Sequence, residues 1–178
     1  MIKNIEVELR SLISKEKYEE LLKFFKQNSK FFGEDYQETY YFDFESNFRI
    51  QRNNSGAKIW YKNGKVHDDI REEVEIHINK NDFDRLERLL GKIGHSVKIK
   101  WFRKRNQFDW NGIIISLDYT KGYGYIIEME LMSSEDDKEK NLQILKQKFS
   151  ELNIPITPKE EFKKKYEEYI ENWEELTR

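Results

Sequence analysis

The chain has 178 residues, and 15% of them are aromatic, so it is long enough for one domain whose core is built around large rings. Charged residues make up 37%, yet the formal net charge is only -2, which argues against a general binder of nucleic acid or anionic membrane. The lack of cysteine excludes disulfides and thiol catalysis. The start has no apolar leader, and the longest aliphatic run, residues 113–115, is too short to cross a bilayer. We therefore expect a soluble, cytoplasmic protein of one domain spanning residues 1–178.

Apolar periodicity and turn residues divide the chain into strands and amphipathic helices. In chain order, we expect a strand at 4–11, a helix at 14–28, strands at 37–44, 47–53, 57–63 and 70–78, a helix at 82–93, strands at 97–108, 112–119 and 124–132, and helices at 134–152 and about 157–176. The last helix has the clearest start, because Thr157, Pro158 and Glu160 have the spacing of a capping box. We expect this helix to pack on the sheet, to plug one end of it, or to serve as a dimer surface.

A pair of glutamates separated by one apolar residue occurs in three strands: IEVELR from Ile5, EVEI at 73–76 and EMEL at 128–131. Successive side chains of a strand point to opposite faces, so each segment has one acidic and one apolar face. Two such charges about 7 Å apart repel by roughly 2 kcal/mol at an effective dielectric of about 20. A positive partner should therefore face them.

The other strands continue this alternation of a charged and an apolar face. The residues that share the acidic face are Glu6, Glu8, Arg10, Arg49, Gln51, Lys58, Trp60, Lys62, Arg71, Glu73, Glu75, His77, Arg103, Arg105, Ser116, Asp118, Glu128 and Glu130. The opposite faces are mainly apolar and can receive the helices. Two architectures fit: an open antiparallel sheet with a solvated charged face, or a closed barrel around a charged tunnel, which would suit a metal-bound polyphosphate.

Several short motifs follow one another along the chain. They are Glu6-x-Glu8-x-Arg10, QETYYF from Gln37, FRIQ at 48–51, KNG at 62–64, Arg71-x-Glu73-x-Glu75, RKR at 103–105, Asp118, GYIIEME from Gly124 and KYEEYI from Lys165. In this order and parity they resemble the signature of the CYTH domain, or triphosphate tunnel metalloenzymes, and most closely the class IV adenylyl cyclases. The chain differs at Arg10, Thr39 and Gln51, where the family has Lys, an acid and a base. KYEEYI stands where the family has Ser-Tyr-x-Glu-Leu-Leu.

The resemblance implies an α+β fold: a closed eight-stranded, mostly antiparallel β-barrel with helices packed on the outside. It implies Mg²⁺ or Mn²⁺ as cofactor. The metal ligands it implies are Glu6, Glu8, Glu128 and Glu130; the catalytic residues are Glu6, Glu8, Glu130 and Asp118; Glu73 and Glu75 are further ligands or orienting groups; and the substrate-binding residues are Arg10, Arg49, Lys62, Arg71, Arg103 and Arg105. On this view the cation and the bases position a triphosphate, and its charge is neutralised during phosphoryl transfer.

The leading functional interpretation is a class IV adenylyl cyclase-like enzyme that converts ATP to cyclic AMP and pyrophosphate. The alternative is a triphosphatase that hydrolyses inorganic triphosphate, thiamine triphosphate or a nucleoside triphosphate. A third interpretation is a binding module that holds polyphosphate without turnover. In each case the partner is a small molecule bearing a triphosphate, with no nucleic acid or membrane partner, and the chain is a monomer or a homodimer.

Overall fold

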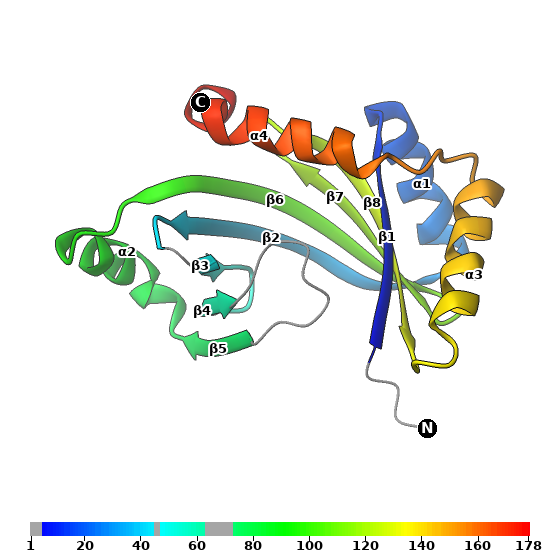
Figure 1. Cartoon of the computed structure of the whole chain (residues 1–178), viewed down its shortest axis with the longest axis horizontal. Coiled ribbons are helices and arrows are strands. Elements are labelled where there is room, and N and C mark those ends of the chain that lie inside the picture. The colour runs from blue at the N-terminus through cyan, green and yellow to red at the C-terminus, as the bar shows by residue number, and fades with distance from the viewer. Residues whose placement is uncertain (1–4, 45–46, 63–72) are drawn as a thin grey trace. The chain divides into compact units, whose positions relative to one another are not determined.

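A computed structural model describes residues 5–44, 47–62 and 73–178 of the chain. The elements are β1 (Ile5–Ile13), α1 (Lys15–Asn28), β2 (Lys30–Phe42), β3 (Asn47–Arg52), β4 (Ala57–Lys62), β5 (Glu73–Ile78), the short 3-10 helix η1 (Lys80–Asp82), α2 (Phe83–Lys92), β6 (Val97–Trp110), β7 (Ile113–Thr120), β8 (Gly124–Ser133), α3 (Lys138–Glu151) and α4 (Lys159–Leu176) (Figure 1). Every expected strand and helix is present, so the predicted α+β class is correct. The strand expected at 37–44 begins earlier, at Lys30, and residues 70–72 of the strand expected at 70–78 lie outside the described residues.

The strands form one hydrogen-bonded sheet in the order β1-β8-β7-β6-β2-β3-β4-β5. β1 and β5 are its two edges, and within the described ranges no strand pairing joins them, so the prediction of a closed barrel is wrong. The alternation of charged and apolar residues that suggested closure is the same on any two-faced sheet, so it could not distinguish the two forms. The apolar side chains of edge strand β5 also remain in solvent: Val74 is 44% and Ile76 54% exposed.

The described chain divides into two compact units. The first contains β1, α1, residues 30–34 of β2, residues 104–110 of β6, β7, β8, α3 and α4 as far as Tyr169. The second contains the remainder of β2 and β6, with β3, β4, β5, η1, α2 and the end of α4. Each unit has its own apolar core.

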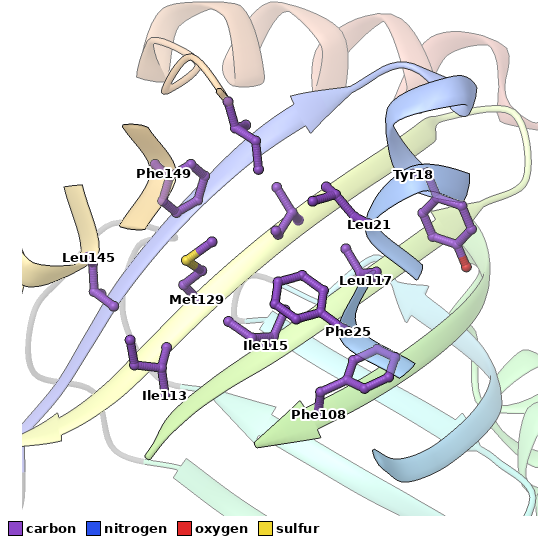
Figure 2. Packing of buried hydrophobic residues seen from close by; sticks show 12 residues of the cluster. Tyr18, Leu21, Phe25, Phe108, Ile113, Ile115, Leu117, Met129, Leu145 and Phe149 are labelled. Carbon is purple, nitrogen blue, oxygen red and sulfur yellow. The ribbon is translucent and has the colours of Figure 1, made fainter. Parts of the chain in front are cut away.

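The core of the first unit lies between the apolar face of its strands and the helices α1 and α3. Figure 2 shows Leu21 and Phe25 of α1 beside Ile115 and Leu117 of β7, with Phe149 of α3 in the same cluster. These side chains are at most 1% exposed. α1 begins after Ser14, whose hydroxyl caps the helix by accepting a hydrogen bond from the backbone N–H of Lys17. The helices cover the apolar face, so the charged side chains of β1 and β8 lie on the opposite face of these strands.

The second unit packs α2 on the back of β2, β3 and β4. Phe83 and Leu90 of α2 meet Tyr40, Phe42 and Ile50, all of them buried. The rings of Tyr40 and Phe83 meet edge to face with their centroids 5.0 Å apart.

Among the described helices of the whole chain, none combines the length and the apolar character needed to span a bilayer.

The start of α4 differs from the prediction. The carbonyl of Pro158 accepts the first helical hydrogen bonds, from the N–H groups of Glu161 and Phe162. The hydroxyl of Thr157 is instead bound to β1: it accepts from the N–H of Leu12 at 2.9 Å and lies 2.8 Å from the hydroxyl of Ser11. The expected capping box of Thr157 is therefore wrong, because β1 takes up the hydroxyl that would have capped the helix.

Candidate functional site

The first unit gathers the acids of β1 and β8 on one face. The antiparallel register places Glu8 directly opposite Glu130 and Arg10 opposite Glu128. Side chains of directly paired residues share a face, so this register confirms the predicted parity. On the β1 side Glu6, Glu8 and Arg10 are exposed, which leaves this face open to a ligand.

The electrostatics of this face reflect the crowding of its carboxyl groups. Glu8 as a whole residue is exposed, but the groups crowded around its carboxyl displace part of the surrounding water. This desolvation, followed by the charge of Glu128, raises the pKa of Glu8 to about 7, and Arg10 only partly opposes the rise. Desolvation also raises the pKa of Glu130, with further contributions from Glu6 and Glu128. When no cation is present, the repulsion between these carboxylates favours their protonated forms. A bound cation would relieve this repulsion.

Arg105 of β6 is a second base beside this cluster, in addition to Arg10. Its guanidinium donates from Nε to Oδ1 of Asp118 at 2.8 Å and from Nη2 to Oδ2 of Asp118 at 2.6 Å. Nη2 also lies 3.4 Å from Glu128. Burial by itself would lower the pKa of Arg105, but Asp118, with Glu128 and Glu8, raises the pKa overall, so Arg105 stays charged. Nη1 takes no part in the pair with Asp118.

A tight turn explains why Arg105 meets Asp118. Asn111 and Gly112 both have positive φ, 56° and 84°, as the two central residues of a type I′ hairpin require. This two-residue turn joins β6 directly to β7. In such a hairpin Trp110 is paired with Ile113. Continuing this pairing residue by residue along both strands places Arg105 opposite Asp118. The same register places Gln107 within hydrogen-bonding distance of Ser116, at 3.3 Å.

Arg10 has an aromatic neighbour on α4. Its guanidinium carbon lies 5.1 Å from the ring centroid of Phe162, a cation–π contact. Phe162 is not among the site residues expected from the sequence, which all lie on strands or in the segments between them. A helical sequence shows that a ring is present, but it does not show which residue of the sheet that ring contacts.

The donor chemistry of the first unit fits a hard divalent cation, because Mg²⁺ and Mn²⁺ prefer carboxylate oxygens. Glu8 and Glu130 lie opposite each other, with Glu6 and Glu128 on the same face. Within the described residues, however, no three acidic or histidine side chains already stand as a preformed metal centre. The predicted ligands therefore supply suitable atoms, and their side chains would have to turn toward a shared ion.

The second unit holds Arg49 of β3 between aromatic rings. Its guanidinium carbon lies 3.7 Å from the ring centroid of Trp60, and its Nη1 donates to the hydroxyl of Tyr41 at 3.0 Å. Nε of Arg49 is buried without a hydrogen-bond partner. An unpaired donor on a buried guanidinium is costly unless a ligand supplies an acceptor. An acceptor that reached this donor would satisfy it, and the substrate-binding role of Arg49 stays a prediction.

The acids of β5 have local partners in the same unit. Glu75 accepts from Nζ of Lys58 at 2.8 Å and lies 3.0 Å from Nε2 of His77. This network favours an orienting role for Glu75. Lys62 and Glu73 are directly paired between β4 and β5, but the structure does not describe their side chains. Arg71 lies outside the described residues.

Two departures from the family pattern prove to be neighbours. Gln51 is paired with Thr39 across β3 and β2, and its amide donates to the hydroxyl of Thr39 at 2.9 Å. Both residues are buried. A neutral hydrogen-bonded pair thus stands where the family pattern has a base and an acid. Nearby, the guanidinium of Arg103 donates to the side-chain oxygen of Gln37 at 2.8 Å.

Several solved structures share the fold at low sequence identity. The PH1012 protein of Pyrococcus horikoshii has a TM-score of 0.68 at 20% identity, over 87% of this chain and 96% of that chain. A Hippeastrum protein, described as a candidate adenylyl cyclase that reveals a dominant triphosphatase activity, has a TM-score of 0.62 at 21% identity over 84% and 88%. A Bacillus halodurans protein, described as a candidate adenylate cyclase, has a TM-score of 0.62 at 19% identity over 89% and 95%. At these identities the likeness shows the fold alone.

A search of curated protein sequences gives no match to the chain. The family model described as the CYTH domain matches residues 4–166, which is most of the chain and includes both units' predicted site residues. This match confirms the family suggested by the motifs that begin at Glu6, Arg49, Arg103 and Gly124. The chain belongs to the CYTH family.

Proposed function

We propose that the chain is a divalent-cation-dependent enzyme that hydrolyses small molecules bearing a triphosphate. The observation that carries this proposal is the face of the first unit where Glu8 and Glu130 lie opposite each other, beside Arg10 and the charged pair of Arg105 and Asp118. Such a face combines oxygen ligands for a cation with bases for phosphate oxygens. Inorganic triphosphate, thiamine triphosphate and nucleoside triphosphates are the candidate substrates.

Glu6, Glu8, Glu128 and Glu130 would hold Mg²⁺ or Mn²⁺. When bound, the cation would neutralise phosphate charge and lower the pKa of a coordinated hydroxyl or water. Arg105 would bind phosphate oxygens, and Asp118 would hold its guanidinium in a fixed plane. Arg10 would bind the same substrate from the β1 side. Phosphoryl transfer needs mainly positioning and charge neutralisation, and these side chains provide both.

Cyclisation of ATP is the second candidate function. It is supported by the sequence resemblance to class IV adenylyl cyclases and by the description of the Bacillus halodurans protein as a candidate adenylate cyclase. It would require a further group that presents the ribose 3′ hydroxyl to the α-phosphorus. Hydrolysis needs only the cation, a water and the charged residues above, so hydrolysis is the simpler use of this face.

Product analysis tests the proposal. The protein is incubated with ATP, inorganic triphosphate or thiamine triphosphate, each with Mg²⁺ and with Mn²⁺. Release of orthophosphate supports hydrolysis, whereas cyclic AMP with pyrophosphate would show cyclisation. Tight binding without any product would show a polyphosphate-binding module and contradict both enzymatic functions.

A further inference from the structure

Three consecutive lysines of α4 have different surroundings. Lys163 pairs with Glu167 at 3.8 Å and Lys164 with Glu168 at 4.0 Å, and the two lysine side chains are 70% and 79% exposed. Lys165 is only partly exposed. Its Nζ lies over the ring of Tyr123, 5.5 Å from the centroid. The first two lysines therefore form ordinary surface pairs, while the third turns toward the β7–β8 turn.

The stem of Lys165 runs along this turn. A Cβ placed on Gly124 would lie 4.0 Å from Cε of Lys165, so the lysine passes over the backbone next to Tyr123. Tyr123 is itself 5% exposed and meets the buried ring of Tyr169 edge to face. The lysine thus lies on a well-packed aromatic surface, which limits the directions its ammonium group can take.

Arg10 lies on the same aromatic wall. Phe162, under the guanidinium of Arg10, and Lys165 are three residues apart on α4 and so lie on one side of the helix. Burial raises the pKa of Tyr123 to about 12, and the charge of Arg10 partly opposes this rise. Two cations of the first unit are therefore held by neighbouring rings.

Neither cation has a carboxylate within 4.0 Å in the part of the chain that the structure describes. A ring attracts the positive charge but leaves strong N–H donors available for an anion. The register places Arg10 opposite Glu128, so this pair of cations lies at the α4 end of the acidic face. A polyphosphate held by a cation at the acids has several further oxygens that such donors can bind.

We propose that Lys165 is a further phosphate-binding residue, which together with Arg10 binds one end of the polyphosphate chain. This inference rests on the proposed function and deepens it, because it extends the substrate site from the sheet to α4.

The test compares binding of inorganic triphosphate, in the presence of Mg²⁺, by calorimetry. Lys165→Gln keeps most of the stem on Tyr123 but removes the charge, and Lys164→Gln is the matched control on the solvent side. We expect Lys165→Gln to raise Kd about tenfold, as for loss of one charge-assisted hydrogen bond, and Lys164→Gln to change Kd by less than about twofold. Lys165→Arg should retain most of the affinity. Thermal melts of each variant verify that the fold is intact.

Equal values of Kd for Lys165→Gln and Lys164→Gln, with the wild type binding well, would overturn the assignment of Lys165 and leave the proposed function standing. Failure of the wild type to bind triphosphate would overturn the proposed function, and this inference with it. If Lys165→Gln unfolds more easily, Lys165→Arg decides: retained fold with lost affinity would contradict a role that requires only a positive charge.

Discussion

Asp118 holds Arg105 through two parallel hydrogen bonds, one from Nε at 2.8 Å and one from Nη2 at 2.6 Å. The side chain of Asp118 is 4% exposed and that of Arg105 is 15% exposed. Both carboxylate oxygens of Asp118 therefore face Arg105. The resemblance implies that Asp118 is a catalytic residue, a further ligand or an orienting group, and this geometry favours an orienting role toward Arg105.

Removal of Asp118 should destabilise the protein strongly. Asp118→Ala removes the main partner of the guanidinium of Arg105, which is largely buried. Breaking a buried pair in this way lowers the unfolding free energy by about 3–5 kcal/mol. Glu151→Gln is the control, because it breaks the more exposed pair with Lys148 and should cost less than about 1 kcal/mol. Urea denaturation measures both. Equal losses of unfolding free energy would mean that the pair of Arg105 and Asp118 stabilises the protein no more than the exposed pair does.

The raised pKa of Glu8 predicts a pH dependence of stability in EDTA. The folded state keeps Glu8 protonated up to about pH 7, whereas the unfolded state loses the proton near the ordinary value of 4.5. The stability from Glu8 is therefore complete below about pH 4.5 and is lost as the pH rises through 7. Glu8→Gln should remove this loss and gain about 0.5–1 kcal/mol at pH 8, a value reduced because Glu8 is exposed to solvent.

Melts at pH 4 and pH 8 check this prediction. Glu174→Gln, on the exposed side of α4, is the control and should follow the wild type at both pH values. A Glu8→Gln variant that melts below the wild type at pH 8 would show that Glu8 is stabilised as a carboxylate, which would contradict the crowding of acids on this face.

Loss of one acid on the charged face should abolish most turnover. We expect Glu6→Gln and Glu130→Gln each to reduce kcat about a hundredfold, the scale seen when a preorganised group that stabilises charge is removed. Glu139→Gln, on the surface of α3, should leave kcat unchanged. Initial rates with Mg²⁺ and with EDTA measure this. Undiminished turnover in EDTA would contradict a metal-dependent mechanism.

The exposed base of β1 predicts a loss of affinity that does not depend on the organic group. Arg10→Ala should weaken binding of inorganic triphosphate and ATP to a similar extent, about tenfold, because Arg10 would contact phosphate oxygens alone. Arg85→Ala removes a base that is 75% exposed and paired with Asp82, and it should have little effect. A loss confined to ATP would assign Arg10 to the nucleoside.

Much of the fold could be predicted from local patterns. The helix at 83–92 and the strands at 47–52 and 57–62 match the predicted ranges within a residue or two, because periodicity and turn residues mark their ends. β2 begins at Lys30, seven residues before the predicted start at 37. The pattern did not predict this first part of the strand, because Gly33, with its φ of 142°, interrupts the alternation of polar and apolar residues. Sheet closure could not be predicted, because it depends on pairing between edge strands and not on the pattern within one strand.

The candidate site was predictable to a different extent. Parity placed Glu8, Glu130 and Arg105 on one face, and the register and hydrogen bonds of the first unit confirm this. The contacts between the charged face and α4 could not be predicted. The contact of Arg10 with Phe162, for example, joins residues that are far apart in the sequence. The hydrogen bond between Gln51 and Thr39 could likewise be identified only once the register of the two strands was known.

The central claim, that the acids of β1 and β8 bind a divalent cation, is tested most directly by thermal melts of the wild type, Glu8→Gln and Glu130→Gln. Each protein is measured in EDTA and again with excess Mg²⁺. In EDTA both variants should melt at or above the wild type, because each removes one charge from a crowded face. Mg²⁺ should raise the melting temperature of the wild type more than that of either variant. If both variants melt below the wild type in EDTA, and Mg²⁺ shifts all three equally, these carboxylates do not form a cation site.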